Sequence, residues 1–169
     1  MPATIREALP ADSQQLITYI QRLCAEPDAN IALSPGEFNL TVEAEQEILA
    51  DYAAADNSIY LVAEIGDEIV GQLQCKGGTR QATRHAATLG MSVDRDWRHR
   101  GIGDQLLARA VQWARETLAV SRLELYVFAR NETAIHLYTK HGFVIEGRRR
   151  RSIYRSGQYL DDLIMALLL

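Results

Sequence analysis

The sequence is poor in cysteine, with Cys24 and Cys75 as the only two in 169 residues. Two isolated thiols are too few for a disulfide framework or a zinc site, which favours a reducing compartment and predicts a cytoplasmic protein. The histidines also lack the spacing of metal ligands, so no metal site is expected; they are His85, His99, His136 and His141.

Long apolar runs are absent as well. The first part of the chain carries charges such as Arg6 and Glu7 and does not resemble a signal peptide. The apolar ending "LIMALLL" is far too short to cross a bilayer and is better explained as a buried strand, so no membrane partner is expected. The net charge of −4 gives no global reason to expect nucleic acid.

The length of 169 residues fits one domain, residues 1–169, that can bury a hydrophobic core without disulfides or a structural metal. Apolar periodicity and turn residues predict an α/β chain in the order β-α-α-β-β-β-α-β-α-β-β, with a largely antiparallel sheet and one βαβ crossover. The expected strands are 4–9, 58–65, 68–76, 85–93, 122–128, 143–154 and 158–169, and the expected helices are 10–24, 44–55, 101–118 and 131–142. The stripe of the third helix is expected to include Leu118.

The crossover contains a glycine turn, Arg98-His99-Arg100-Gly101-Ile102-Gly103. Glycine lets a backbone approach a ligand closely, and the start of a helix offers unpaired N–H groups, so the turn suits an anion such as phosphate. No Gly-Lys-Ser/Thr follows, which excludes a P-loop, and Leu106 stands where a dinucleotide fingerprint needs glycine or alanine. The alternative is a purely structural turn with solvated arginines, but the preceding strand and the following amphipathic helix favour the anion.

The turn resembles the acetyl-CoA signature of the GCN5-related N-acetyltransferase (GNAT) family: Arg or Gln, two residues, Gly, one residue, Gly or Ala. The stretches "MSVDRDWRHRGIG", "LELYVFARNETAIHLYTKHGFVIEG" and "GQYLDDLIMAL" are similar to further family blocks in the same order. The resemblance implies a mixed, mostly antiparallel central sheet, helices on both faces, and two parallel strands that splay apart at the cofactor cleft.

The resemblance also implies roles for individual residues. Tyr138 matches a tyrosine proposed to donate a proton to the coenzyme A sulfur, and Asn131 matches an asparagine that contacts the cofactor arm. If the resemblance is set aside, Tyr138 is interpreted as a core tyrosine and Asn131 as a helix cap. The pantetheine arm and thioester are expected along one strand and the pyrophosphate on the turn. The residues implied for the pantetheine arm and thioester are Met91, Ser92 and Val93. Those implied for the pyrophosphate are Arg98, His99, Arg100, Gly101, Ile102 and Gly103.

The general base and the acceptor are less well defined by the sequence. A lysine-type amine has a pKa near ~10.4 and must lose a proton before it attacks, which calls for a carboxylate or a water chain. Glu124 is favoured over Glu64 as that carboxylate. The arginine run, Arg148 to Arg151 with Arg155, is expected to lie on a solvated hairpin rather than to bind nucleic acid, and cations beside the acceptor would favour an amine that carries a carboxylate.

The function expected from these features is transfer of an acetyl group from acetyl-CoA to a primary amine of a small amino-acid-like metabolite by direct attack. Three alternatives stay open: a non-catalytic CoA-binding sensor, a protein N-terminal acetyltransferase, and an RNA-binding accessory protein. A homodimer is also left open.

Overall fold

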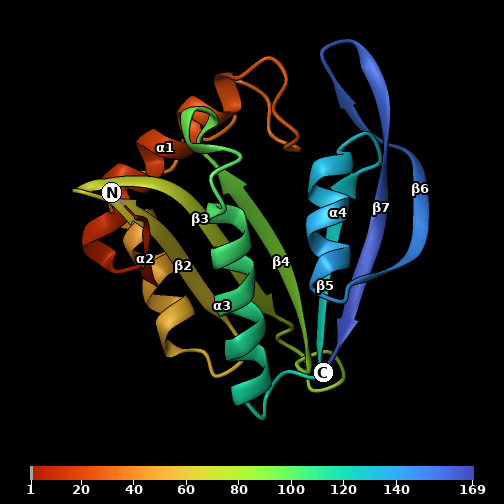
Figure 1. The fold of residues 1–169 in the computed structure, drawn as a ribbon. Coiled ribbons are helices and arrows are strands. Elements are labelled where there is room, and N and C mark those ends of the chain that lie inside the picture. The colour runs from red at the N-terminus through yellow and green to blue at the C-terminus, as the bar shows by residue number, and fades with distance from the viewer. Residues whose placement is uncertain (1) are drawn as a thin grey trace.

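Seven strands form one sheet in the spatial order β1-β2-β3-β4-β5-β7-β6 (Figure 1). The computed structural model describes residues 2–169. All neighbouring strands are antiparallel except β4 and β5, which are parallel. The strands are β1 (Thr4–Glu7), β2 (Ile59–Ile65), β3 (Glu68–Gly77), β4 (Ala86–Val93), β5 (Arg122–Phe128), β6 (Val144–Arg155) and β7 (Gln158–Leu168).

Helices cover both faces of this sheet. They are α1 (Ser13–Ala25), α2 (Val42–Ala54), α3 (Ile102–Glu116) and α4 (Glu132–Lys140). Alternate residues of β2 face opposite sides: Leu61 lies in one core with Leu106 of α3, and Val62 lies in another with Leu16 of α1. The mixed, mostly antiparallel fold with helices on both faces is therefore confirmed.

The end of α3 differs from the expected one. The helix stops at Glu116 because Thr117 adopts an extended conformation, with ψ of 135°. The chain then leaves the helix axis before Leu118, which is fully exposed. The prediction that Leu118 belongs to the buried stripe was wrong, since helical periodicity in the sequence continues past the point where the backbone turns away.

The hairpin of β6 and β7 closes as expected through Ser156 and Gly157. Both have positive φ, 52° and 77°, as a two-residue type I′ turn requires. No helix within residues 2–169 is both long and apolar enough to cross a membrane.

Candidate active site

The parallel strands β4 and β5 separate halfway along their length. Their pairing runs from Ala86 to Leu89 on β4, and beyond that point β4 pairs only with β3. The N–H of Asp94 donates to the carbonyl of Val70 on β3 at 2.8 Å. Main-chain groups alternate in direction along a strand, so the N–H groups of Met91 and Val93 face the opposite edge, toward β5. The splay thus leaves hydrogen-bonding backbone on the open side of β4.

The glycine turn follows directly at this end of β4. None of the main-chain N–H groups from His99 to Asp104 donates a hydrogen bond to a residue that the structure describes. His99 and Gly101 have φ of 61° and 80°, and left-handed residues in such a loop turn successive N–H groups toward one side. The N-terminus of α3 adds the positive end of its dipole. The turn therefore has the geometry of an anion site.

The cations of the turn are already engaged. Arg98 donates from Nε to the carbonyl of Val93 at 3.0 Å and from Nη2 to the carboxylate of Glu26 at 2.6 Å. The guanidinium of Arg100 lies 4.8 Å from the centre of the Trp97 ring. Because both guanidinium groups already have contacts, the main-chain N–H groups of the turn are the donors available to an anion.

Gly103 permits close packing beneath the turn. A Cβ at this position would lie 3.4 Å from Cδ2 of Leu137 on α4 and 3.7 Å from Cε of Met91 on β4. These are ordinary contact distances, so an alanine would fit but a β-branched side chain would push the three elements apart.

The position of Tyr138 is set by both ends of α4. Asn131 caps the helix, its side chain accepting a hydrogen bond from the N–H of Ala134 at 3.2 Å. At the other end, Phe143 N–H donates to the carbonyl of Tyr138 at 3.1 Å, and Gly142 has φ of 91°. This is a Schellman motif, which predicts an apolar contact between the same two residues. The rings of Tyr138 and Phe143 are indeed 5.8 Å apart.

Burial raises the pKa of Tyr138 to about 12, and the nearby Cys75 adds to the effect. The tyrosine is only 6% exposed, and no hydrogen bond joins its hydroxyl to any part of the described chain. A phenol in this state stays protonated at neutral pH, as a proton donor must. An ordinary tyrosine is also protonated at neutral pH, so burial widens the pH range over which Tyr138 keeps its proton.

Ser92 faces the other side of the sheet, under α1. Its hydroxyl oxygen accepts from the hydroxyl of Tyr19 at 2.9 Å and from Nε2 of Gln72 at 3.3 Å. The Oε1 of Gln72 is buried and has no hydrogen-bond partner among residues 2–169. The sequence did not point to Tyr19 or Gln72, because each occupies an ordinary position in an amphipathic helix or a buried strand.

The two candidate bases lie in different parts of the sheet. Glu124 lies on β5 and accepts from Nε of Arg122 at 3.0 Å, while Arg122 also binds Glu146. Glu64 lies on β2, two strands away from β4, and accepts from Nε of Arg6 at 2.5 Å. Only Glu124 therefore stands on a strand that borders the splay.

Arg148 to Arg151 are all exposed, in agreement with the solvated hairpin expected from the sequence, whereas Arg155 is buried. Arg149 forms an ion pair with the buried Asp162 and lies 4.2 Å from the centre of the Tyr126 ring. Arg155 is only 7% exposed and is directed inward. Side-chain alternation along β6 is interrupted by register shifts, one of them between Arg149 and Ile153. The carboxylates that pair with Arg148 and Arg149 lie on β7, 13 positions further along the chain.

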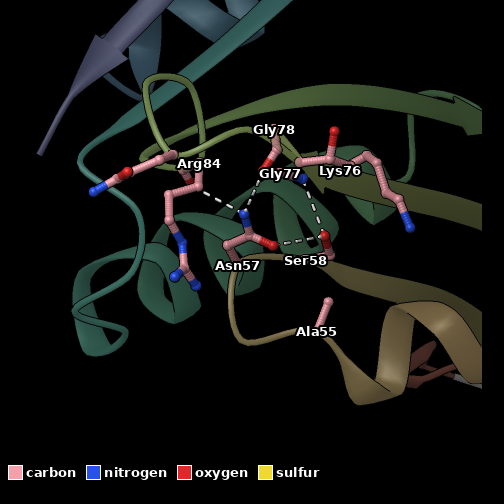
Figure 2. Close-up of a pocket in the computed structure, with 9 residues that line it drawn as sticks. Ala55, Asn57, Ser58, Lys76, Gly77, Gly78 and Arg84 are labelled. Atoms are coloured by element: carbon pink, nitrogen blue, oxygen red, sulfur yellow. Dashed lines mark hydrogen bonds between the residues drawn. The ribbon is translucent and has the colours of Figure 1, made fainter.

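A cavity of about 530 Å³ lies at the opposite end of β4, far from the glycine turn (Figure 2). Nδ2 of Asn57 donates to the carbonyls of Gly78 and Arg84, and Ser58 accepts from the N–H of Gly77. These polar groups satisfy one another, so the cavity gives no sign of a ligand. No cluster of three or more His, Cys, Asp or Glu in the described chain is placed to hold a metal.

Comparison with known proteins agrees with this geometry. Residues 25–143 match the family described as Acetyltransferase (GNAT). The chain is 37% identical over 121 residues to the L-amino acid N-acetyltransferase AaaT of Escherichia coli (strain K12), covering 72% of this chain and 73% of that protein. A GNAT-family acetyltransferase structure from Streptococcus pneumoniae has 34% identity and a TM-score of 0.94, with 99% of both chains covered.

A second similar structure, yncA from Salmonella typhimurium, contains its cofactor acetyl-CoA. It has a TM-score of 0.86 at 19% identity, covers 100% of this chain and 95% of that one, and so shares the fold. This chain therefore has the fold of a structure that contains acetyl-CoA. The chain belongs to the GNAT family of acetyltransferases.

Proposed function

We propose that this protein transfers the acetyl group of acetyl-CoA to the primary amine of a small amino-acid-like metabolite by direct attack. The observation that carries the proposal is the run of N–H groups from His99 to Asp104 that donate to no residue the structure describes, at the end of a strand whose neighbour has splayed away. Such a turn suits a pyrophosphate, and the exposed edge of β4 suits an amide-containing arm.

The residues present fit acetyl-CoA. Met91, Ser92 and Val93 would hold the pantetheine arm and thioester, with the N–H of Met91 directed to the thioester oxygen. Asn131 would contact the arm in addition to capping α4. The turn would hold the pyrophosphate through Arg98, His99, Arg100, Gly101, Ile102 and Gly103. Acetyl-CoA supplies the acetyl group as a thioester, and fixed main-chain donors stabilise charge that develops on its oxygen at little reorganisation cost.

Two side chains would carry out the proton transfers of the reaction. Tyr138 is protonated at neutral pH and would donate to the departing thiolate. Glu124 would accept the proton of the incoming ammonium, directly or through water, before the amine attacks. The pairing of Glu124 with Arg122 holds the carboxylate in one orientation, which a base needs.

The acceptor class is supported by the relative AaaT, which is named an L-amino acid N-acetyltransferase. A local feature agrees with it: Arg149 binds Asp162 through Nε and Nη2 and remains nearly half exposed, so Nη1 can reach a substrate carboxylate. A protein N-terminal acetyltransferase remains the second candidate, since an N-terminal amine needs the same chemistry. The presence of Tyr138, which matches the family's proposed proton donor, favours an enzyme over a CoA-binding sensor.

A turnover screen tests the proposal. Release of free coenzyme A from acetyl-CoA is measured with L-amino acids, polyamines, aminoglycosides and peptide N-termini. We expect the highest specificity constant with an L-amino acid. A higher value for spermidine or a peptide than for every amino acid would reject the acceptor class, and tight binding without turnover would favour the sensor.

A further inference from the structure

The segment between α1 and α2, residues 26–41, is tied to two separate parts of the proposed site through its first residue, Glu26. The carboxylate of Glu26 accepts from Nη2 of Arg98, in the glycine turn, at 2.6 Å. The main-chain carbonyl of Glu26 accepts from Nη2 of Arg155, near the tip of the β6–β7 hairpin, at 3.0 Å. Figure 1 shows this segment reaching across the open end of the splayed strands, near the β6–β7 tip.

The side chain of Arg155 binds main-chain carbonyls of this segment. Besides Glu26, the guanidinium donates to the carbonyls of Cys24 at 3.2 Å, Ile31 at 2.8 Å and Leu33 at 2.6 Å. No carboxylate in the described chain pairs with it. A guanidinium has five donors in a rigid fork, so several carbonyls held at once fix the path of the chain around it. The carbonyl of Cys24 also belongs to the last turn of α1, where a cation is favoured.

Arg98 links the other side of Glu26 to the cofactor strand. Its Nε donates to the carbonyl of Val93, the last residue of β4, so one guanidinium joins the strand end to the segment. The side chains of Arg98 and Glu26 are 35% and 17% exposed, so solvent screens their ion pair only in part. A continuous set of contacts therefore runs from β4 through Arg98, Glu26 and Arg155 to the β6–β7 tip.

We propose that Glu26 is a positioning residue that couples the cofactor turn to the β6–β7 hairpin. The proposal rests on the proposed function, in which an anion binds the turn and the hairpin borders the acceptor. A bound pyrophosphate places negative charge beside Arg98 and competes with Glu26 for the guanidinium. Any shift of Glu26 moves carbonyls that Arg155 holds. Binding at the two sites is then linked, and the linkage is reciprocal.

Hydrogen exchange of the full-length protein, with and without saturating coenzyme A, tests this coupling. In the wild type, coenzyme A should change amide exchange in the turn, residues 98–104, and also in residues 26–35 and 150–158, by about fivefold or more. In Glu26→Gln the change should persist in the turn and drop below about twofold in residues 150–158. The acceptor KM should rise more than kcat falls, because the chemical groups are intact.

Asp28→Asn is the matched control, because Asp28 is exposed in the same segment and its carboxylate forms no ion pair within the described chain. It should behave as the wild type. Arg155→Lys, which keeps the charge but loses the fork, should uncouple the hairpin as Glu26→Gln does and replaces that variant if it fails to fold.

The outcomes separate this inference from the proposed function. If coenzyme A changes exchange only in residues 98–104 of the wild type, or if Glu26→Gln responds as Asp28→Asn does, the coupling is rejected while the cofactor site stands. If coenzyme A changes nothing and calorimetry detects no binding, the proposed cofactor site fails, and the coupling with it.

Discussion

Glu124 and Arg122 lie on the same face of β5, and Nε of Arg122 donates to the Glu124 carboxylate at 3.0 Å. Arg122 binds Glu146 as well, at 2.9 and 2.6 Å, so one guanidinium holds two carboxylates. Of the three residues, Glu124 alone combines a carboxylate with a position on a strand that borders the splay. This arrangement allows the proposed base to be tested against a carboxylate that shares its partner.

Glu124→Gln should lower kcat/KM for the acceptor amine about 100-fold at neutral pH, since removal of a general base typically costs a factor of that order or more. Affinity for acetyl-CoA, measured by calorimetry, should stay the same. Glu146→Gln is the control, because it removes the other carboxylate from Arg122 and leaves Glu124 in place. Equal rates for the two variants would reject Glu124 as the base.

Gly101→Val should weaken acetyl-CoA binding by about tenfold or more, because a branched side chain covers N–H groups that face the ligand and strains a residue with φ of 80°. Gly66→Val is the control for strain, since Gly66 has φ of 63° and open space around it in the β2–β3 turn. Both variants should lose similar stability, and only the first should lose affinity. Unchanged affinity in Gly101→Val would make the turn purely structural.

Tyr138→Phe should reduce kcat about 100-fold and leave acetyl-CoA affinity within about twofold, because the ring still packs on Phe143 while the proton donor is lost. Stopped-flow detection of thiol release together with calorimetry measures both quantities. A wild-type rate in this variant would point to water as the donor.

The pH profile gives an independent check on Tyr138. Its pKa is raised to about 12, so the hydroxyl keeps its proton throughout pH 7–10, and kcat should show no fall caused by this group in that range. A raised pKa in the folded state also contributes stability that is complete below the ordinary value of about 10 and is lost as pH rises through about 12. A fall in kcat near pH 9 that is absent in Tyr138→Phe would show that the tyrosine ionises too early.

Two leucines expected on one stripe of α3 should behave differently. Leu107 is fully buried, and Leu107→Ala should cost about 2–5 kcal/mol of unfolding free energy, as cavities in packed cores do. Leu118 lies beyond the helix end and is exposed, so Leu118→Ala should leave the midpoint of urea denaturation unchanged. A loss in Leu118→Ala comparable to that in Leu107→Ala would mean that the helix continues in solution.

Features that depend on neighbouring residues were predictable from the sequence. Asn131 caps α4 and Gly142 ends it, and both boundaries follow from backbone rules that act within a few residues. The glycine turn and the strand before it were found for the same reason. The contacts of Glu26 with Arg98 and of Arg155 with Glu26 join residues 72 and 129 positions apart, and no local pattern encodes such a pairing. Burial of Arg155 is equally invisible, because arginine is usually exposed.

The strand order has a consequence for the making of the protein. β7 lies between β5 and β6, and among the strands of residues 2–169 it alone pairs with β6. Before β7 folds into place, β6 has no partner among the described strands and β5 has one unpaired edge. Unpaired edges on a nascent chain are where strands from other chains attach. A substitution that destabilises β7 should therefore lower the yield of soluble protein, and a chaperone that shields β5 and β6 should restore it.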